Sequence, residues 1–364
     1  MGLFDPRTIM TAARSGSASH WGCDGKIFVT GGSGVVGRAL LTLLEGYPVL
    51  ALRHKRAFAP DVVTVPGDLT TPRFGLDQKA YHKLLSDVHL IVHCAAVTSV
   101  APPTNHKPVN RGGTEEVLRC AREASIPTIY VSTAFVESGI SQIDEPSGYE
   151  ASKREAEELV RSAGVPVAIV RPSLVAGDSR SGEISEFQGL HLVLSRVAQN
   201  LLPIAPCSPS ARVDFVPQDY VAEVIKALID TEPARWPDLV WATQGDAALT
   251  VEGFLEAMQH LSTAVGLAKP TARFIPYERI KRLFEPVFLP ALPRLQRREL
   301  RALLMFARYL NVEQPFPSLA PEVADVLGLR PAPAPAMVLQ RNFEHWWQHY
   351  GSKELDVAKG NGTA

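Results

Sequence analysis

Apolar residues in the first half of the chain follow two alternating periods. Short runs rich in β-branched residues are each followed by a stretch in which apolar residues recur every three or four positions, which is typical of strands followed by helices. Six runs predict strands: Lys26–Thr30, Pro48–Arg53, Val62–Val65, Leu90–His93, Thr128–Ser132 and Val167–Val170. Helical patterns lie between them, near Val36, Gln78, Arg111 and Tyr149. This order predicts an α/β fold with a Rossmann-type, doubly wound parallel sheet.

The regular alternation stops after Arg171. Residues 183–200 and 220–230 predict helices, and residues 239–243 predict a strand that rejoins the sheet. Later helical patterns, at 251–265, 277–284, 297–310 and 338–350, predict a smaller, mainly helical subdomain that covers the substrate. We therefore expect a flexible arm (1–24), a dinucleotide-binding domain (25–245) with a substrate-covering insert at about 180–212, a C-terminal helical substrate subdomain (246–356) and a flexible tail (357–364).

Composition and charge narrow the classes of function. The 364 residues are 46% hydrophobic and carry a net charge of −1, so the basic excess of a nucleic-acid-binding protein is missing from the sequence. The four cysteines are widely spaced without a CxxC pair, which predicts no metal site and no disulfide framework. The first 24 residues lack the apolar core of a secretory signal, and we recognise no membrane span. We expect a cytoplasmic protein; its oligomeric state leaves no signal in the sequence.

A glycine-rich run joins the first predicted strand to the first predicted helix. Residues 29–37 read Val-Thr-Gly-Gly-Ser-Gly-Val-Val-Gly, which spaces Gly31, Gly34 and Gly37 three residues apart. Such glycines allow a tight turn, close approach of the backbone to a pyrophosphate and close seating of the helix on the strand. Val35 and Val36 would stand in the first helical turn, beside the bound phosphates. The strand-turn-helix context favours this interpretation over an ordinary glycine turn.

Tyr149 and Lys153 lie four residues apart, so on a helix they share one face. A phenol has an ordinary pKa of about 10, and a nearby ammonium group favours its anionic form and brings it closer to proton chemistry at neutral pH. Thr133 stands at the carboxyl end of the fifth predicted strand, where ligands bind in open α/β sheets. Its hydroxyl is placed to hydrogen-bond a substrate carbonyl oxygen. The alternative is a strand-capping threonine beside a solvated Tyr/Lys pair.

With these motifs the chain resembles the extended short-chain dehydrogenases/reductases over roughly residues 26–245. Further matching motifs are Gly67-Asp68-Leu69, His93-Cys94-Ala95-Ala96, Asn110 with Gly113-Thr114, and Arg171-Pro172-Ser173. The resemblance implies that Asp68 and Leu69 flank the adenine and that Ala95 and Ala96 lie near the cofactor ribose. It also implies that Asn110 supports a proton relay, that Lys153 holds the nicotinamide ribose, and that Pro172 and Ser173 lie beside the nicotinamide.

Three segments are similar to the thioester-reductase and fatty-acyl-reductase branch of that family: residues 131–136, 171–184 and 214–222. The resemblance implies reduction of an acyl thioester to an aldehyde, with a further reduction to the alcohol left open. The loop between Thr133 and Tyr149 is shorter than in large members of the branch. Because we recognise no adenylation or carrier domain, we expect the acyl group to come from coenzyme A or from a separate acyl carrier protein.

The segment after the second predicted strand bears on the choice of cofactor. It reads Arg53-His-Lys-Arg56, where an acidic residue would instead hydrogen-bond the free ribose hydroxyls of NAD. Arg53, with Arg56, can pair with a 2′-phosphate through charge-assisted hydrogen bonds. The segment therefore favours NADPH over NADH, unless these charges are only solvated.

Other interpretations of the sequence remain open. The same residues also suit a ketone or alcohol oxidoreductase, or a nucleotide-sugar epimerase or dehydratase. A non-catalytic dinucleotide-sensing protein is disfavoured because Thr133, Tyr149, Lys153 and Asn110 are all present. A late basic cluster suits either docking of an acidic carrier protein or a solvated helix face; it comprises Lys281, Arg282, Arg294, Arg297, Arg298 and Arg301.

Overall fold

A computed structural model describes residues 25–56, 62–99, 104–137, 147–187, 189–280 and 308–351, together with residues 282, 285–287, 289–291, 293–294, 297, 301, 304 and 306–307. The predicted arm, the predicted tail and much of the helix predicted at 297–310 lie outside the described residues.

The centre of the fold is a seven-stranded sheet in the order β11-β6-β5-β4-β1-β2-β3, with every pairing parallel. Its strands are β1 (Lys26–Thr30), β2 (Val49–Arg53), β3 (Thr64–Pro66), β4 (Val88–His93), β5 (Thr128–Val131), β6 (Val167–Pro172) and β11 (Leu239–Ala242). The strand order reverses at β1, where Val29 lies opposite Ala51 of β2 and Val92 of β4. Such a switch point opens a crevice at the carboxyl ends of the strands.

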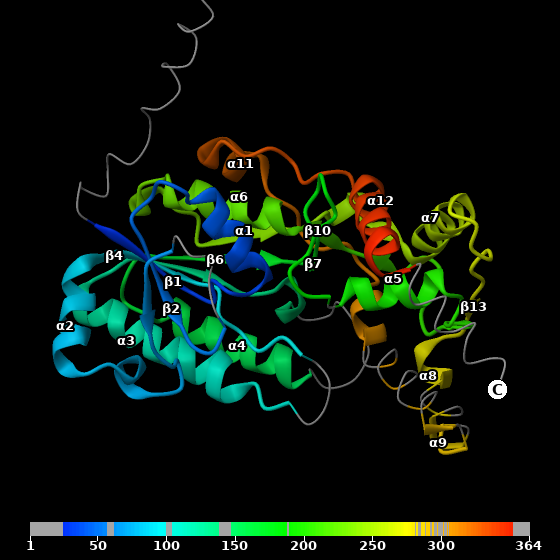
Figure 1. Cartoon of the computed structure of the whole chain (residues 1–364), viewed down its shortest axis with the longest axis horizontal. Coiled ribbons are helices and arrows are strands. Elements are labelled where there is room, and N and C mark those ends of the chain that lie inside the picture. The colour runs from blue at the N-terminus through cyan, green and yellow to red at the C-terminus, as the bar shows by residue number, and fades with distance from the viewer. Residues whose placement is uncertain are drawn as a thin grey trace, which may run out of the picture.

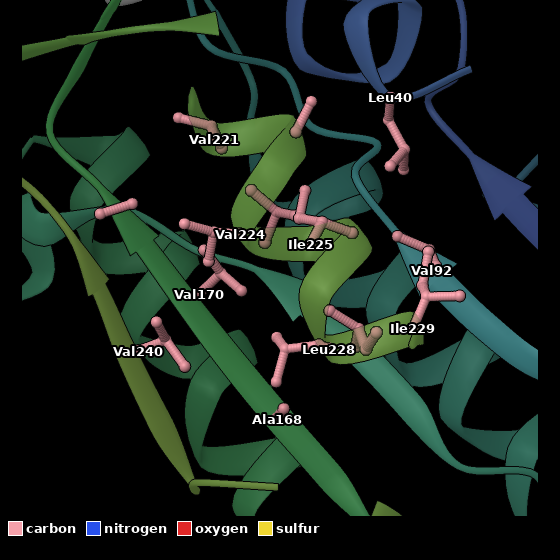
Figure 2. Close-up of a cluster of buried hydrophobic side chains, with 14 of the residues drawn as sticks. Leu40, Val92, Ala168, Val170, Val221, Val224, Ile225, Leu228, Ile229 and Val240 are labelled. Atoms are coloured by element: carbon pink, nitrogen blue, oxygen red, sulfur yellow. The ribbon is translucent and has the colours of Figure 1, made fainter. Parts of the chain in front are cut away.

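Helices cover both faces of this sheet (Figure 1). One face carries α1 (Val35–Leu43) and α6 (Gln218–Ile229), and the other carries α2 (Gln78–Asp87), α3 (Thr114–Ala124) and α4 (Gly148–Arg161). Figure 2 shows α6 directing Val224, Ile225 and Leu228 toward sheet residues such as Val170 and Val92. The doubly wound α/β fold predicted from the strand pattern is confirmed.

The rest of the chain forms smaller elements around the carboxyl edge of the sheet. Three two-stranded ladders pair β7 (Leu174–Ala176) with β10 (Phe215–Pro217), β8 (Ile204–Ala205) with β13 (Arg273–Phe274), and β9 (Arg212–Val213) with β12 (Leu249–Thr250). The helices here are α5 (Leu190–Ala198), α7 (Val251–Ala264), α8 (Tyr277–Arg279), α9 (Glu285–Val287), α11 (Pro321–Leu327) and α12 (Pro335–Trp346). Apolar side chains of α5, α7 and α12 share one core, separate from the core under α6.

Two elements differ from the sequence-based expectation. The helix predicted over 183–200 begins only at Leu190, because Gly189, with φ +49° and ψ −107°, interrupts the helical path before it. Leu319, Val323 and Leu327, which lie in the predicted C-terminal subdomain, pack on the core formed by α1, α6 and the sheet. This segment therefore covers the dinucleotide-binding half rather than the substrate half.

Within the described parts of the chain, none of the helices combines the length and hydropathy needed to cross a membrane.

Candidate active site

The glycine turn lies between β1 and α1 at the switch point of the sheet. Gly31 adopts φ +75°, and a Cβ atom placed there would lie 2.4 Å from the backbone nitrogen of Ala95. At Gly37 a Cβ atom would lie 2.2 Å from the carbonyl oxygen of Gly31. Only glycine fits at either position without a backbone shift. Gly34 stands at the N-cap of α1, where the missing side chain leaves the first N–H groups of the helix accessible from the cleft. Bare backbone and a helix N-terminus together fit a pyrophosphate.

A cavity of about 1880 Å³ runs over the carboxyl ends of the strands. This volume exceeds the roughly 300–1,000 Å³ of a pocket for one small ligand, so it has room for a dinucleotide and a substrate together. Most residues predicted for the site line it: Gly31, Gly34, Val35, Val36, Gly37, Arg56, Asp68, Leu69, Ala95, Ala96, Thr133, Tyr149, Lys153, Pro172 and Ser173. Arg53 and Asn110 are not among its lining residues.

Thr133 follows β5 and caps the short helix 134–136. Its side chain is buried; the Oγ1 atom accepts a hydrogen bond from the Phe135 N–H at 3.4 Å and lies 3.5 Å from the carbonyl oxygen of Pro172. The hydroxyl also lies near enough to the phenol of Tyr149 to lower the pKa of that phenol. The structure thus brings Thr133 and Tyr149 together at the cleft.

Tyr149 stands in the first turn of α4, which begins with a capping box between Ser147 and Glu150. This cap fixes where the helix starts and so which residues face the cleft. Burial raises the pKa of Tyr149 to about 12, although the nearby Thr133 hydroxyl opposes this rise. The phenol is therefore neutral at physiological pH, a hydrogen-bond and proton donor. The spacing of Tyr149 and Lys153 predicted a shift toward the anion; desolvation instead favours the neutral phenol.

Lys153, one turn further along α4, is 1% exposed. Its Nζ atom donates a hydrogen bond to the carbonyl oxygen of Val131 at 2.7 Å and lies 4.2 Å from the centre of the Tyr130 ring. Burial lowers the pKa of Lys153 to about 7, against the opposing effect of Glu157 and Cys94. The amine therefore exchanges protons near neutral pH, in the same cleft as Tyr149.

A buried ion pair holds α4 against the sheet. The guanidinium group of Arg171, on β6, donates to both carboxylate oxygens of Glu157 at 2.9 and 2.7 Å, and to Glu137 at 2.6 Å. It also stacks over the ring of Trp241, 4.9 Å from its centre. From the sequence, Arg171 was predicted only as part of the Arg171-Pro172-Ser173 motif. The signal for its partner was present, because Glu157 follows Lys153 by four residues and so shares its helix face.

Asn110 lies behind the cleft, in the π-helical turn Pro108–Gly113. Its side chain accepts from the Val97 N–H at 2.7 Å and donates to the Val97 carbonyl at 3.1 Å and to Ser152 Oγ at 3.0 Å. It therefore ties the loop after β4 to α4. The predicted part of Asn110 in a proton relay stays a prediction, since its amide reaches α4 through Ser152.

The basic segment after β2 divides into two parts. Arg56 lines the cleft and donates to the two carboxylate oxygens of Glu186 at 2.7 and 3.3 Å. Glu186 lies in the loop that leads to α5. His54 and Lys55 also line the cleft, and His54 lies 3.5 Å from the carboxylate of Asp68. Arg53 is exposed at the end of β2. Of the late basic cluster, Lys281 and Arg298 lie outside the described residues, so carrier docking there stays a prediction.

The chain is similar to proteins of known families. Residues 44–225, half of the chain, match the family described as male sterility protein. The glycine betaine reductase of Emericella nidulans is 33% identical over 57% of this chain, and the isonitrile lipopeptide synthase of Mycobacterium tuberculosis is 31% identical over 51%. The chain spans 21% and 9% of the lengths of these two relatives. The terminal R domain of the myxalamid PKS-NRPS pathway aligns with a TM-score of 0.69 at 25% identity, covering 91% of this chain and 92% of that one.

The buried amine of Lys153 makes stability depend on pH. An exposed lysine titrates near about 10.4, so between about pH 7 and pH 10 the unfolded chain binds more protons than the folded chain. Proton uptake by Lys153 in the unfolded chain therefore favours unfolding. This effect on the free energy of unfolding is absent at high pH and grows as the pH falls toward 7. Relative to Lys153→Met, the wild type should gain stability as the pH rises through this range.

Urea denaturation at several pH values measures this difference. The control is Lys83→Met, which removes the ammonium group of a lysine that is 72% exposed on α2. A Lys153→Met difference that stays constant with pH would contradict the assigned burial of the amine.

Proposed function

The chain belongs to the male sterility protein family, in the thioester-reductase-like branch of the extended short-chain dehydrogenases/reductases, and from this premise we propose that it is an NADPH-dependent reductase of acyl thioesters. One observation carries the proposal: Thr133, Tyr149 and Lys153 line the same cleft as the glycine turn. That cleft combines a phosphate cradle with a neutral phenol and a hydroxyl, the groups that a carbonyl reduction requires.

The cofactor would lie along the dinucleotide half of the cleft. The N–H groups at the start of α1 would hold its pyrophosphate, and the missing side chains of Gly31 and Gly37 let the surrounding backbone pack closely enough to present those groups. Asp68 and Leu69 would flank the adenine, Ala95 and Ala96 the ribose, and Pro172 and Ser173 the nicotinamide. When bound, the reduced nicotinamide supplies the hydride.

The residues of the chain supply the proton and the polar contacts. Thr133 and Tyr149 would hydrogen-bond the thioester oxygen and stabilise the negative charge that develops on it as hydride adds to the carbonyl carbon. Tyr149 then donates its proton to that oxygen, which yields a hemithioacetal. Loss of the thiol, with return of a proton to sulfur, leaves an aldehyde. A second hydride and a second proton from Tyr149 would give the alcohol. Lys153 would stabilise the phenolate and hold the nicotinamide ribose.

The thiol carrier would be coenzyme A or an acyl carrier protein. Two relatives support a thioester donor, because one is a lipopeptide synthase and another is the terminal domain of a PKS-NRPS pathway. A ketone or alcohol oxidoreductase, and a nucleotide-sugar epimerase, would use the same hydroxyl groups on a different acceptor, without release of a thiol.

The thiol therefore distinguishes these functions. Purified protein is incubated with NADPH and either acyl-CoA, acyl carrier protein loaded with the same acyl group, or a panel of ketones. We expect NADPH oxidation with a thioester, accompanied by one free thiol per NADPH if the product is the aldehyde and one per two NADPH if it is the alcohol. Oxidation with ketones alone, without thiol, would contradict the proposal.

The proton donor is tested by Tyr149→Phe. Because positioned acid catalysis contributes about 10²–10⁴-fold, kcat should fall by that factor while the Kd for NADPH changes less than about twofold. Tyr350→Phe, which alters a tyrosine that is 42% exposed near the end of α12, is the control and should retain full turnover. Equal activity in Tyr149→Phe would remove this residue from the mechanism.

The preference for NADPH is tested at the two arginines. Charge-assisted hydrogen bonds to a phosphate contribute enough that Arg56→Gln should raise the Kd for NADPH about ten- to a hundredfold and leave the Kd for NADH unchanged. Arg53→Gln should have a smaller effect, because Arg53 does not line the cleft. Fluorescence titration with each cofactor measures both constants. Unchanged NADPH affinity in both variants would contradict a phosphate-binding role for the basic segment.

A further inference from the structure

The substrate half of the cleft is lined largely by hydrocarbon. Leu190 and Val193 of α5 face it together with Phe187, Leu202 and Phe306. The polar side chains at this end include Arg196, Tyr309 and Asn200, and the Oδ1 atom of Asn200 already accepts a hydrogen bond from the Thr271 N–H at 3.1 Å. A polar substituent buried here would lose its hydration against a mostly apolar wall, which is costly. The lining therefore suits an aliphatic group.

A second, smaller cavity of about 50 Å³ lies on the other side of α5. Its walls come from α5, α7, β8 and β13 and include Val197, Phe254 and Phe274. Three apolar residues, Val193, Leu202 and Ile204, line both this cavity and the cleft, as does Asn200, so the two spaces adjoin at these residues. Asn200 and Thr271 are the polar residues among those that line it.

A cavity of this kind favours hydrocarbon over water. Protein interiors are close-packed, and the few apolar voids that persist stay dry and accept apolar ligands. At about 50 Å³ the cavity has room for the last few carbons of a chain. It adjoins the apolar end of the cleft at Val193, Leu202 and Ile204.

We propose that the small cavity behind α5 binds the end of an aliphatic acyl chain, and that Val193, Leu202 and Ile204 form the passage that sets the preferred chain length. This inference rests on the proposed thioester reduction and narrows its substrate to medium- and long-chain aliphatic acyl thioesters. A short chain ends within the cleft, whereas a longer chain passes these three side chains and fills the cavity.

The chain-length dependence of turnover tests this site. With even-numbered saturated acyl-CoA substrates from four to sixteen carbons, each additional buried methylene should raise kcat/KM about fourfold until the chain reaches the end of the cavity. Beyond that length the rise should stop. A flat profile across all lengths would overturn the inference and leave thioester reduction intact.

Substitutions that fill the small cavity test whether it is the site that binds the end of the acyl chain. Ala272 lines the small cavity and not the cleft, at a half-buried position just before β13. Ala272→Leu should lower kcat/KM at least about tenfold for the longest substrates and leave butyryl-CoA within about twofold. Ala205→Val, on β8, should have the same effect. It is used instead of Ala272→Leu if that variant does not fold. The matched control is Ala264→Leu at the exposed end of α7, which should not change the profile. An equal loss at all lengths would contradict the site.

Binding measurements test the apolar site independently of the reaction. Non-reactive S-alkyl-CoA thioethers are titrated by calorimetry, with and without NADPH. We expect affinity to rise with alkyl length in the wild type and to level off earlier in Ala272→Leu. If no acyl thioester is reduced but this pattern holds, the proposed reaction fails while the apolar site stands. If thioesters are reduced but affinity is independent of length, only the site fails.

Discussion

The active site depends on how firmly α4 is seated against the sheet. Tyr149 and Lys153 lie on one face of this helix, and a small rotation about its axis would carry both away from the cleft. The Arg171 guanidinium opposes such a rotation, because it bonds both carboxylate oxygens of Glu157 from the neighbouring strand β6. An ion pair buried to this degree stabilises little by itself, but breaking it would leave an unpaired charge in the interior. It therefore favours one helix orientation over the alternatives.

The burial of α4 against the sheet also sets the protonation states of Tyr149 and Lys153. Burial disfavours charge, so it raises the pKa of Tyr149 to about 12 and lowers that of Lys153 to about 7. A neutral phenol beside an easily exchanged ammonium is suited to donate a proton and recover it. His93, beneath the site, is kept neutral in the same way, since burial lowers its pKa to about 3. The site is thus preorganised by exclusion of water as well as by the ion pair that orients α4.

The features predicted from the sequence are those that depend on residues close together in the chain. The glycine turn, six strands and the Tyr149–Lys153 pair each depend on residues a few positions apart, so periodicity and spacing located them. Contacts between distant segments were not predicted, such as Arg56 with Glu186 or the return of residues 319–332 to the core beside α6. The shift of Tyr149 away from the anion was missed for the same reason, because burial arises from many segments together. The C-terminal helix α12 is fixed similarly: Asn342 accepts the Gly177 N–H at 2.7 Å, which no local pattern indicates.

The proposed reduction requires that Thr133 and Tyr149 act on one substrate oxygen as a unit. A double-mutant cycle on the single-turnover rate of NADPH oxidation, using Thr133→Ala, Tyr149→Phe and the double variant with one acyl-CoA, tests it most directly. Residues that act as a unit are strongly non-additive, so the double variant should be hardly slower than Tyr149→Phe alone. Losses that multiply independently would mean that the two hydroxyl groups do not act together on that oxygen.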